Sequence, residues 1–235
     1  MQNLTCIKHY DFTKMKKLPE SDFNVQTGEK WANNELQQYV NDEEHLFFQN
    51  GLVLRATLED GVYKSARINT KDKFFFQYGR VEITANVPSG KGTWPALWMI
   101  SQESKYGHWP KSGEIDIMEH TGKNKDHVFL CLHTESYNHT RKDQYYFETK
   151  FPGLTNQFHT YAIEWDEDNI IYFIDNQKIV RYNKYDKEDT SYKGWPFNQK
   201  FFLIMNLAIG GKFGGEVDNS IFPVDFIIKD IKVYQ

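Results

Sequence analysis

Three carboxylates lie within six residues of the segment GEIDIMEHTG (113–122): Glu114, Asp116 and Glu119. The residues between them are apolar, as expected for a strand that buries one face. Glutamate and aspartate are unfavourable in strands, and like charges on one face repel each other. The cluster therefore points to a chemical role, with an exposed acidic strand as the structural alternative.

The spacing decides whether these three carboxylates can act together. On a regular strand Glu114 and Asp116 share a face, while Glu119 points the opposite way. One extra residue in a β-bulge moves everything after it to the other face. We therefore predict a bulge at Ile117–Met118, which would align Glu119 with the other two acids.

Carboxyl groups that line one groove can carry out glycoside hydrolysis. One ionised carboxylate serves as nucleophile, and one protonated carboxyl serves as general acid. A third acid disfavours ionisation of its neighbours and so helps the general acid to keep its proton. The middle position assigns this assisting role to Asp116.

The elements that must position these acids are short strands separated by turns. No long stretch has the 3.6-residue period of a helix, and the segment 174–179 predicts a hairpin that turns at Asp175–Asn176. The pattern predicts an all-β protein, a sandwich or jelly roll of antiparallel sheets, in a single domain over residues 1–235. Besides the carboxylate segment, the strand-like segments are 51–58, 79–87, 127–134, 159–166, 169–182, 200–209 and 225–235.

The composition of the chain favours some classes of function and disfavours others. The chain has 235 residues, is 16% aromatic and carries a formal net charge of −4, which disfavours nucleic acid as the main partner. Abundant tyrosine and tryptophan suit a sugar-binding groove or an interface. No apolar stretch is long enough to span a membrane, and no signal peptide is visible. Cys6 and Cys131 could pair, but they form neither a disulfide framework nor a CxxC metal motif.

Several segments together resemble glycoside hydrolase family 16, in particular its laminarinase-like endo-β-1,3(4)-glucanase branch. The resemblance extends over nearly the whole chain and follows the family's order. The segments that carry it are KWANNELQQYV (30–40, similar to the family's Trp-x-Asn-x-Glu), YKSARINTK, YGRVEITANVPSGKGTWPALWMI, HWPKSGEIDIMEHTG, LHTESYNHT, GWPFNQKFFLIMNLAIGG and SIFPVDFIIKDIKVYQ.

The resemblance implies a concanavalin A-like β-jelly roll of two curved antiparallel sheets, with substrate in the concave groove. It implies endo-hydrolysis of β-1,3- or mixed β-1,3/1,4-glucan, such as laminarin, cereal β-glucan or lichenan, with retention of configuration. Glu114 matches the nucleophile, Asp116 the assisting acid and Glu119 the general acid/base. The spacing here is the family's bulged form, E-x-D-x-x-E, which goes with laminarinases and several algal-polysaccharide hydrolases.

Further positions match the family's substrate groove. Aromatic residues are expected to stack on sugar rings, polar ones to bind hydroxyl groups, and His133 to contact the leaving-group sugar or tune Glu119. Phe213 replaces a family tryptophan, and Thr84 replaces a frequent arginine, so both bear on the choice of substrate. The expected substrate-binding residues are Asn34, Arg67, Glu82, Trp94, Trp98, Trp109, His133, Asn206 and Phe213.

The resemblance also bears on cofactors, partners and location. It implies no cofactor for catalysis, and a structural calcium with Asp230 as a ligand. The expected partner is a β-glucan polysaccharide or oligosaccharide, bound by a monomer. Family members suggest a secreted, cell-surface or periplasmic protein.

Three alternatives stay open at this point. The first is a hydrolase of a marine galactan of the agar, porphyran or carrageenan type. The second is a lectin-like module that binds glucan without cutting it, although both glutamates are present. The third is transglycosylation, in which a sugar takes the place of water as the acceptor.

Overall fold

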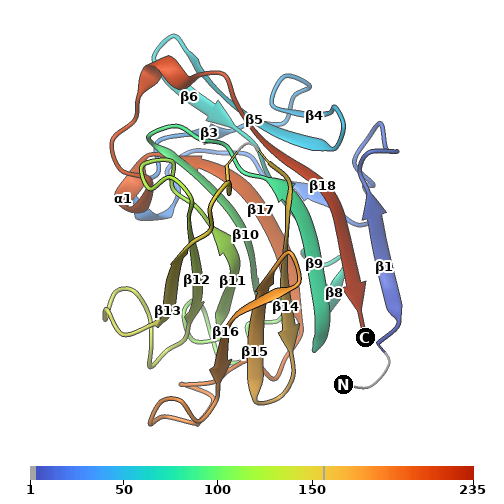
Figure 1. Ribbon diagram of the computed structural model, residues 1–235, viewed down its shortest axis with the longest axis vertical. Coiled ribbons are helices and arrows are strands. Elements are labelled where there is room, and N and C mark those ends of the chain that lie inside the picture. The colour runs from blue at the N-terminus through green and yellow to red at the C-terminus, as the bar shows by residue number, and fades with distance from the viewer. Residues whose placement is uncertain (1–3, 156) are drawn as a thin grey trace.

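The computed structural model describes residues 4–155 and 157–235. Two β-sheets pack face to face (Figure 1). Within the described ranges, neighbouring strands run antiparallel, except that β3 and β6 are parallel. The ten-stranded sheet has the order β16 (Gln177–Asn183), β15 (Asn169–Ile174), β14 (His159–Trp165), β9 (Gly79–Asn86), β18 (Val224–Tyr234), β5 (Leu52–Glu59), β6 (Val62–Ser65) and β3 (Gln38–Tyr39), with β1 (Cys6–Asp11) beside β18 and β4 (Leu46–Phe48) beside β5.

The second sheet holds the carboxylate strand near its middle. The described residues also include three short helical segments: η1 (Ala32–Asn34), α1 (Gly211–Gly214) and η2 (Asn219–Ile221). The described residues place eight strands here, in the order β13 (Tyr145–Lys150), β12 (His127–His133), β11 (Glu114–Glu119), β10 (Thr93–Ser101), β17 (Phe201–Ile209), β7 (Arg67–Asn69) and β2 (Asn24–Val25), with β8 (Phe75–Phe76) beside β17.

The predicted sandwich of two antiparallel sheets is confirmed, and each predicted strand is present within a residue or two. The predicted hairpin is also confirmed. β15 and β16 are joined through Asp175 and Asn176, whose φ angles of 49° and 63° are the left-handed values that a tight hairpin turn requires. Strands that the sequence did not indicate include β2, β3 and β8, which are two residues long and too short to show a period.

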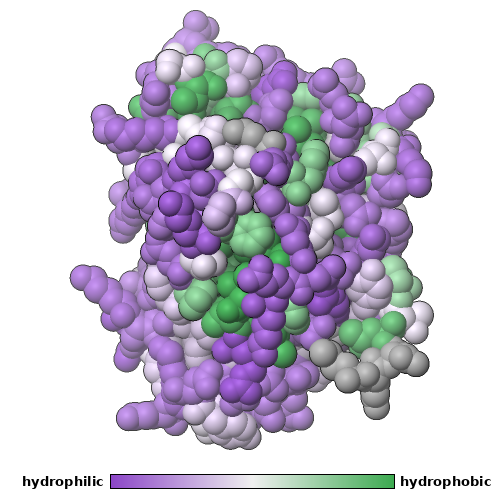
Figure 2. Space-filling model, in the orientation of Figure 1, coloured by the Kyte–Doolittle hydropathy of each residue, from purple (hydrophilic) through white to green (hydrophobic). Residues whose placement is uncertain are grey.

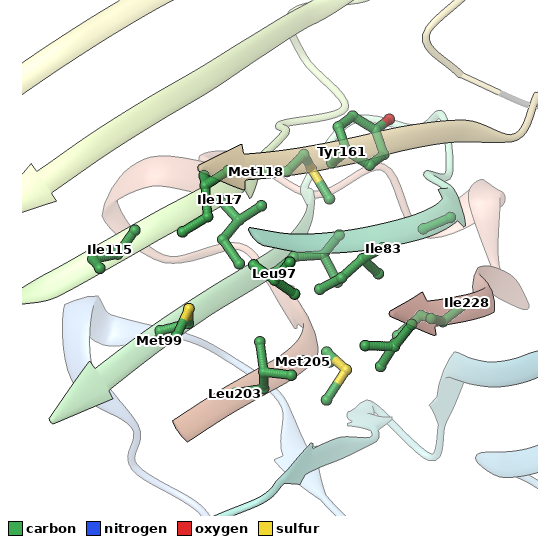
Figure 3. Close-up of a cluster of buried hydrophobic side chains, with 14 of the residues drawn as sticks. Ile83, Leu97, Met99, Ile115, Ile117, Met118, Tyr161, Leu203, Met205 and Ile228 are labelled. Atoms are coloured by element: carbon green, nitrogen blue, oxygen red, sulfur yellow. The ribbon is translucent and has the colours of Figure 1, made fainter. Parts of the chain in front are cut away.

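The core lies between the two sheets and follows largely from the alternation of side chains along the strands. On β10, Leu97 and Met99 point inward and are fully buried. They meet Leu203 and Met205 of β17, and the cluster includes Ile83 and Ile228 from the opposite sheet (Figure 3). Burial of this apolar surface is the main force that holds the sheets together.

The surface contrasts with that core. Figure 2 shows one face of the molecule, which is largely hydrophilic with apolar residues gathered only in small areas. Among the residues described, no helix is long and apolar enough to cross a lipid bilayer. Cys6 is exposed, Cys131 is buried, and both are free thiols, so the pairing considered for them does not occur.

Candidate active site

A cleft of about 330 Å³ opens on the face of the eight-stranded sheet that points away from the core. Alternation on β10 builds its floor, because the residues between the core-facing ones turn outward. The cleft is lined by Trp31, Ala32, Asn33, Glu35, Arg67, Trp94, Ala96, Trp98, Ile100, Trp109, Glu114, Asp116, Glu119, His139 and Asn206. A larger hollow of about 930 Å³, between residues 15–25 and 41–48, contains none of the predicted site residues.

The predicted bulge is present in β11 and brings the three acids together. Across β12, Asp116 pairs with Cys131 and Glu119 pairs with Phe129, so two residues of β11 stand opposite one of β12. Ile117 and Met118, the two residues of the bulge, are both buried in the core. Glu119 therefore returns to the face of Glu114 and Asp116, and all three carboxyls line the cleft.

Burial dominates the electrostatics of these acids. It raises the pKa of Glu114 to about 8 and that of Glu119 to about 8, and the negative charge of Asp116 adds to both shifts. Burial alone raises the pKa of Asp116 to about 8. His133 opposes the shift at Glu114 and Glu119. Burial and mutual repulsion therefore prevent the three carboxyls from all being ionised together near neutral pH, so the cluster holds a proton while part of it stays charged.

Histidine side chains border the acid cluster. His133 is 5% exposed on β12, and its Nε2 lies 3.3 Å from Asp116 Oδ2 and 3.7 Å from Glu114 Oε1. It thus contacts the acids, although it does not line the open cleft. His139, which sequence reasoning missed, does line the cleft, and its ring centroid lies 5.2 Å from that of Trp109.

Tryptophans from β10 and from the loop after it line the cleft. Trp94 donates its indole N–H to Glu119 Oε1 over 2.9 Å, which orients that carboxyl. Trp109 lies in the loop between β10 and β11 and is 45% exposed, so its ring is free to meet a ligand. The structure places Trp94 and Trp98 in the cleft lining, as the family resemblance implied.

Hydrogen bonds and cation–π contacts hold the side chains around Trp98 in place. Trp98 donates its indole N–H to Asn206 Oδ1 over 2.7 Å, and Asn206 Nδ2 donates to the hydroxyl of Tyr39 over 3.0 Å. The guanidinium of Arg67 lies over the rings of Trp31 and Trp98, at 4.7 Å and 5.0 Å from their centroids. These contacts leave little freedom to the aromatic floor.

The structure corrects two of the predicted binding residues. Glu82 lies on β9 of the ten-stranded sheet, where it binds Arg80 at 2.7 Å, so the expectation that it lines the cleft is wrong. Asn34 is exposed, and its neighbours Asn33 and Glu35 line the cleft instead. The Trp-x-Asn-x-Glu spacing of residues 31–35 carried the signal for that pair.

Phe213 occupies a supporting position. It belongs to α1 and packs its ring edge-on against Trp94, with 5.3 Å between centroids, and it does not line the cleft. Its expected stacking on sugar is therefore replaced by a contact that fixes the orientation of Trp94.

The surroundings of Asp230 do not fit the calcium site that the family resemblance implies. One carboxylate oxygen lies 2.6 Å from His9 Nε2, and the other lies 3.4 Å from the ammonium of Lys232. A calcium ion needs six to eight oxygen ligands and is repelled by a cationic neighbour. This carboxylate is engaged in ion pairing instead.

Known proteins resemble this chain over most of its length. The sequence matches the family described as Glycosyl hydrolases family 16 over residues 25–220. It is 38% identical to a β-glucanase of Rhodothermus marinus, over 96% of this chain and 82% of that protein.

Solved structures agree in fold as well. The laminarinase of Flavobacterium sp. UMI-01 is 38% identical, with a TM-score of 0.91 over 98% of this chain and 100% of the other. A non-specific endo-β-1,3(4)-glucanase solved with 1,3-β-D-cellobiosyl-glucose at its active site is 30% identical, with a TM-score of 0.92 over 100% of this chain and 96% of the other.

Proposed function

Because the chain belongs to glycoside hydrolase family 16, we propose that it cuts internal bonds of β-1,3- or mixed β-1,3/1,4-glucans by double displacement. The observation that carries this proposal is the bulge of β11, which turns Glu114, Asp116 and Glu119 toward one cleft. The family chemistry needs no catalytic cofactor.

In the first step, Glu114 attacks the anomeric carbon and forms a covalent glycosyl ester. Glu119 donates its proton to the glycosidic oxygen, so the leaving sugar departs as a neutral alcohol. The raised pKa of Glu119 keeps that proton in place near neutral pH. The indole of Trp94 holds the carboxyl of Glu119 in one orientation.

In the second step, Glu119 acts as a general base. It takes a proton from a water molecule that attacks the anomeric carbon, and the ester bond to Glu114 breaks. Asp116 lies between the two glutamates in the strand, and its charge raises the pKa of both. His133, whose Nε2 lies close to Asp116 and Glu114, opposes the rise in pKa at both glutamates.

The cleft walls support recognition of a glucan chain. Trp109 offers an exposed ring for stacking beside the acids, and Arg67 and Asn206 offer polar groups for sugar hydroxyls. We expect the tryptophans of the cleft floor to determine the choice of substrate, because the C–H faces of glucose rings stack on indole rings. We expect a requirement for a β-1,3 bond at or next to the cut.

The direct test compares wild type with Glu114→Gln on laminarin, barley β-glucan, lichenan, agarose and cellulose, with the products sized. Wild type should release oligosaccharides of mixed length from the first three and leave cellulose intact. Glu114→Gln should retain the fold, measured by circular dichroism, and bind laminarin while losing hydrolysis. Faster cleavage of agarose would identify a galactan hydrolase, and binding by wild type without cleavage would identify a lectin-like module.

Stereochemistry tests the double displacement separately. Carboxyl groups about 5–5.5 Å apart give retention, whereas wider pairs give inversion. Proton NMR of the earliest products should therefore show the β-anomer first. An initial burst of α-anomer would contradict the roles given to Glu114 and Glu119.

A further inference from the structure

The acid cluster has a thiol neighbour that the glycosidase chemistry does not use. Cys131 stands directly opposite Asp116 in the β11–β12 ladder, and Glu114 stands opposite His133. Alternation turns Cys131 and His133 to the same face as the acids. One ligand atom from each of Asp116, Cys131 and His133 lies within 4.8 Å of the others.

One oxygen of the carboxylate in this group lacks a hydrogen-bond donor. Asp116 is 3% exposed, and its Oδ2 accepts no hydrogen bond from the described residues. The nearest basic atom is His133 Nε2 at 3.3 Å. Buried carboxylate oxygens are nearly always hydrogen-bonded or coordinated, so this oxygen calls for a ligand.

We propose that Asp116, Cys131 and His133 form a binding site for a thiophilic divalent cation of the Zn²⁺ class. Thiolate, imidazole and carboxylate are the ligands that Zn²⁺ prefers, at about 2.0–2.3 Å. Those bond lengths place tetrahedral ligand atoms roughly 3.3–3.8 Å apart, and the separation of His133 Nε2 and Asp116 Oδ2 is already 3.3 Å. The Cys131 sulfur lies within 4.8 Å of the other two ligand atoms and would close the remaining distance on binding.

Binding changes the protonation of two ligands. The Cys131 thiol loses its proton to solvent, and His133 coordinates through a deprotonated Nε2. The cation is reached through the cleft, because Asp116 lines it. Calcium and magnesium prefer all-oxygen sites and should not compete.

Occupancy of this site inhibits hydrolysis, a consequence that rests on the proposed function. The cation removes the negative charge of Asp116 beside the glutamates and engages His133. Because His133 Nε2 lies 3.7 Å from Glu114 Oε1, a cation bound to His133 and Asp116 stands beside the nucleophile and competes with the anomeric carbon for its electron pair. Zn²⁺ should therefore inhibit reversibly, and a chelator should restore activity.

The test uses cobalt(II) as a spectroscopic substitute on the full chain. Wild type titrated with Co²⁺ should develop a near-ultraviolet thiolate-to-cobalt band, and Cys131→Ala and Cys131→Ser should both lose it. Cys6→Ser, which changes the exposed thiol, is the matched control and should keep the band. Circular dichroism melting curves establish that each variant is folded.

Inhibition is measured next, with Zn²⁺ and laminarin. Loss of the thiolate ligand should raise the half-inhibitory Zn²⁺ concentration at least roughly tenfold in both Cys131 variants, while Cys6→Ser behaves as wild type. Absence of the cobalt band in wild type, or its persistence in the Cys131 variants, overturns the site whether or not the protein hydrolyses glucan. Equal Zn²⁺ inhibition of wild type and the Cys131 variants overturns its link to activity.

Discussion

The charge of Asp116 adds to the rise in pKa of the two glutamates beside it. Burial is the larger cause of the raised pKa of Glu114 and of Glu119, and the charge of Asp116 is the second. An acid whose role is to influence two other acids should reveal itself in the pH dependence of the reaction as well as in its rate.

We expect Asp116→Asn to shift the alkaline limb of the pH profile of kcat/KM to lower pH. Without the neighbouring charge, the pKa of Glu119 falls, so the general acid loses its proton at a lower pH. The rate at the optimum should fall by roughly tenfold or more, or about 1.4 kcal/mol for each factor of ten. Asp230→Asn, on the opposite sheet, is the control and should leave the profile in place. An unchanged or upward-shifted limb would contradict the role of Asp116.

Trp109 is the exposed aromatic beside the acids. Trp109→Ala should lower kcat as well as raise KM for laminarin, because stacking holds the reacting sugar in its distorted shape. We expect a loss of roughly two orders of magnitude in kcat/KM, about 3 kcal/mol. Tyr185→Ala removes an exposed aromatic outside the cleft and should act at the wild-type rate. Wild-type kinetics for Trp109→Ala would rule out this stacking role.

At the scale of elements, one hydrogen-bonded chain ties three strands together beneath the cleft. Trp98 of β10 bonds to Asn206 of β17, and Asn206 bonds to Tyr39 of β3. Because β3 belongs to the other sheet, the chain also links the two layers. The orientation of the cleft floor therefore depends on a buried side chain that carries out no chemistry.

Asn206→Ala should destabilise the protein by about 1–3 kcal/mol, since it leaves the indole N–H of Trp98 without its acceptor and removes one hydrogen bond from the hydroxyl of Tyr39. For a domain of this size, each kcal/mol corresponds to a fall in Tm of about 2–4 °C. Glu103→Ala truncates an exposed loop side chain away from the cleft and should leave Tm within 1 °C or so of wild type. Equal melting temperatures for the two variants would show that the chain contributes nothing to stability.

At the scale of the whole molecule, the acids that serve catalysis reduce stability. Burial raises the pKa of Glu119 from an ordinary value of 4.5 to about 8. Between those pH values, the folded protein keeps a proton that the unfolded chain has released. The free energy of unfolding therefore falls as the pH rises through this range.

Glu119→Gln removes that dependence, because glutamine does not ionise and its side-chain oxygen can still accept the bond from Trp94. The variant should match wild type in Tm near pH 4.5 and exceed it at pH 8, by about 2–4 °C for each kcal/mol released. Thermal melts at the two pH values, with Glu82→Gln as the matched control, measure the difference. A Tm advantage that is the same at both pH values would show that ionisation of Glu119 is not its source.

The sequence by itself determined the chemistry and the strand pattern of this protein. Glu114, Asp116 and Glu119 stand close together in the chain, so their types, their spacing and the need for a bulge are local properties. The same holds for the hairpin at Asp175–Asn176, whose turn depends on two adjacent residues. Alternation is also local, since it follows from backbone geometry with a period of two.

Only the tertiary structure decided which other residues reach the cleft. The direction of a side chain follows from its own strand, but its partners depend on the order of strands in a sheet. Trp98 and Asn206 meet although 108 positions separate them in the chain. Glu82 was misplaced because its strand belongs to the other sheet, and Asp230 because His9 and Lys232 approach it in three dimensions. Cys131 lies beside the acids for the same reason, because β12 pairs with β11 and no local sequence pattern encodes that pairing.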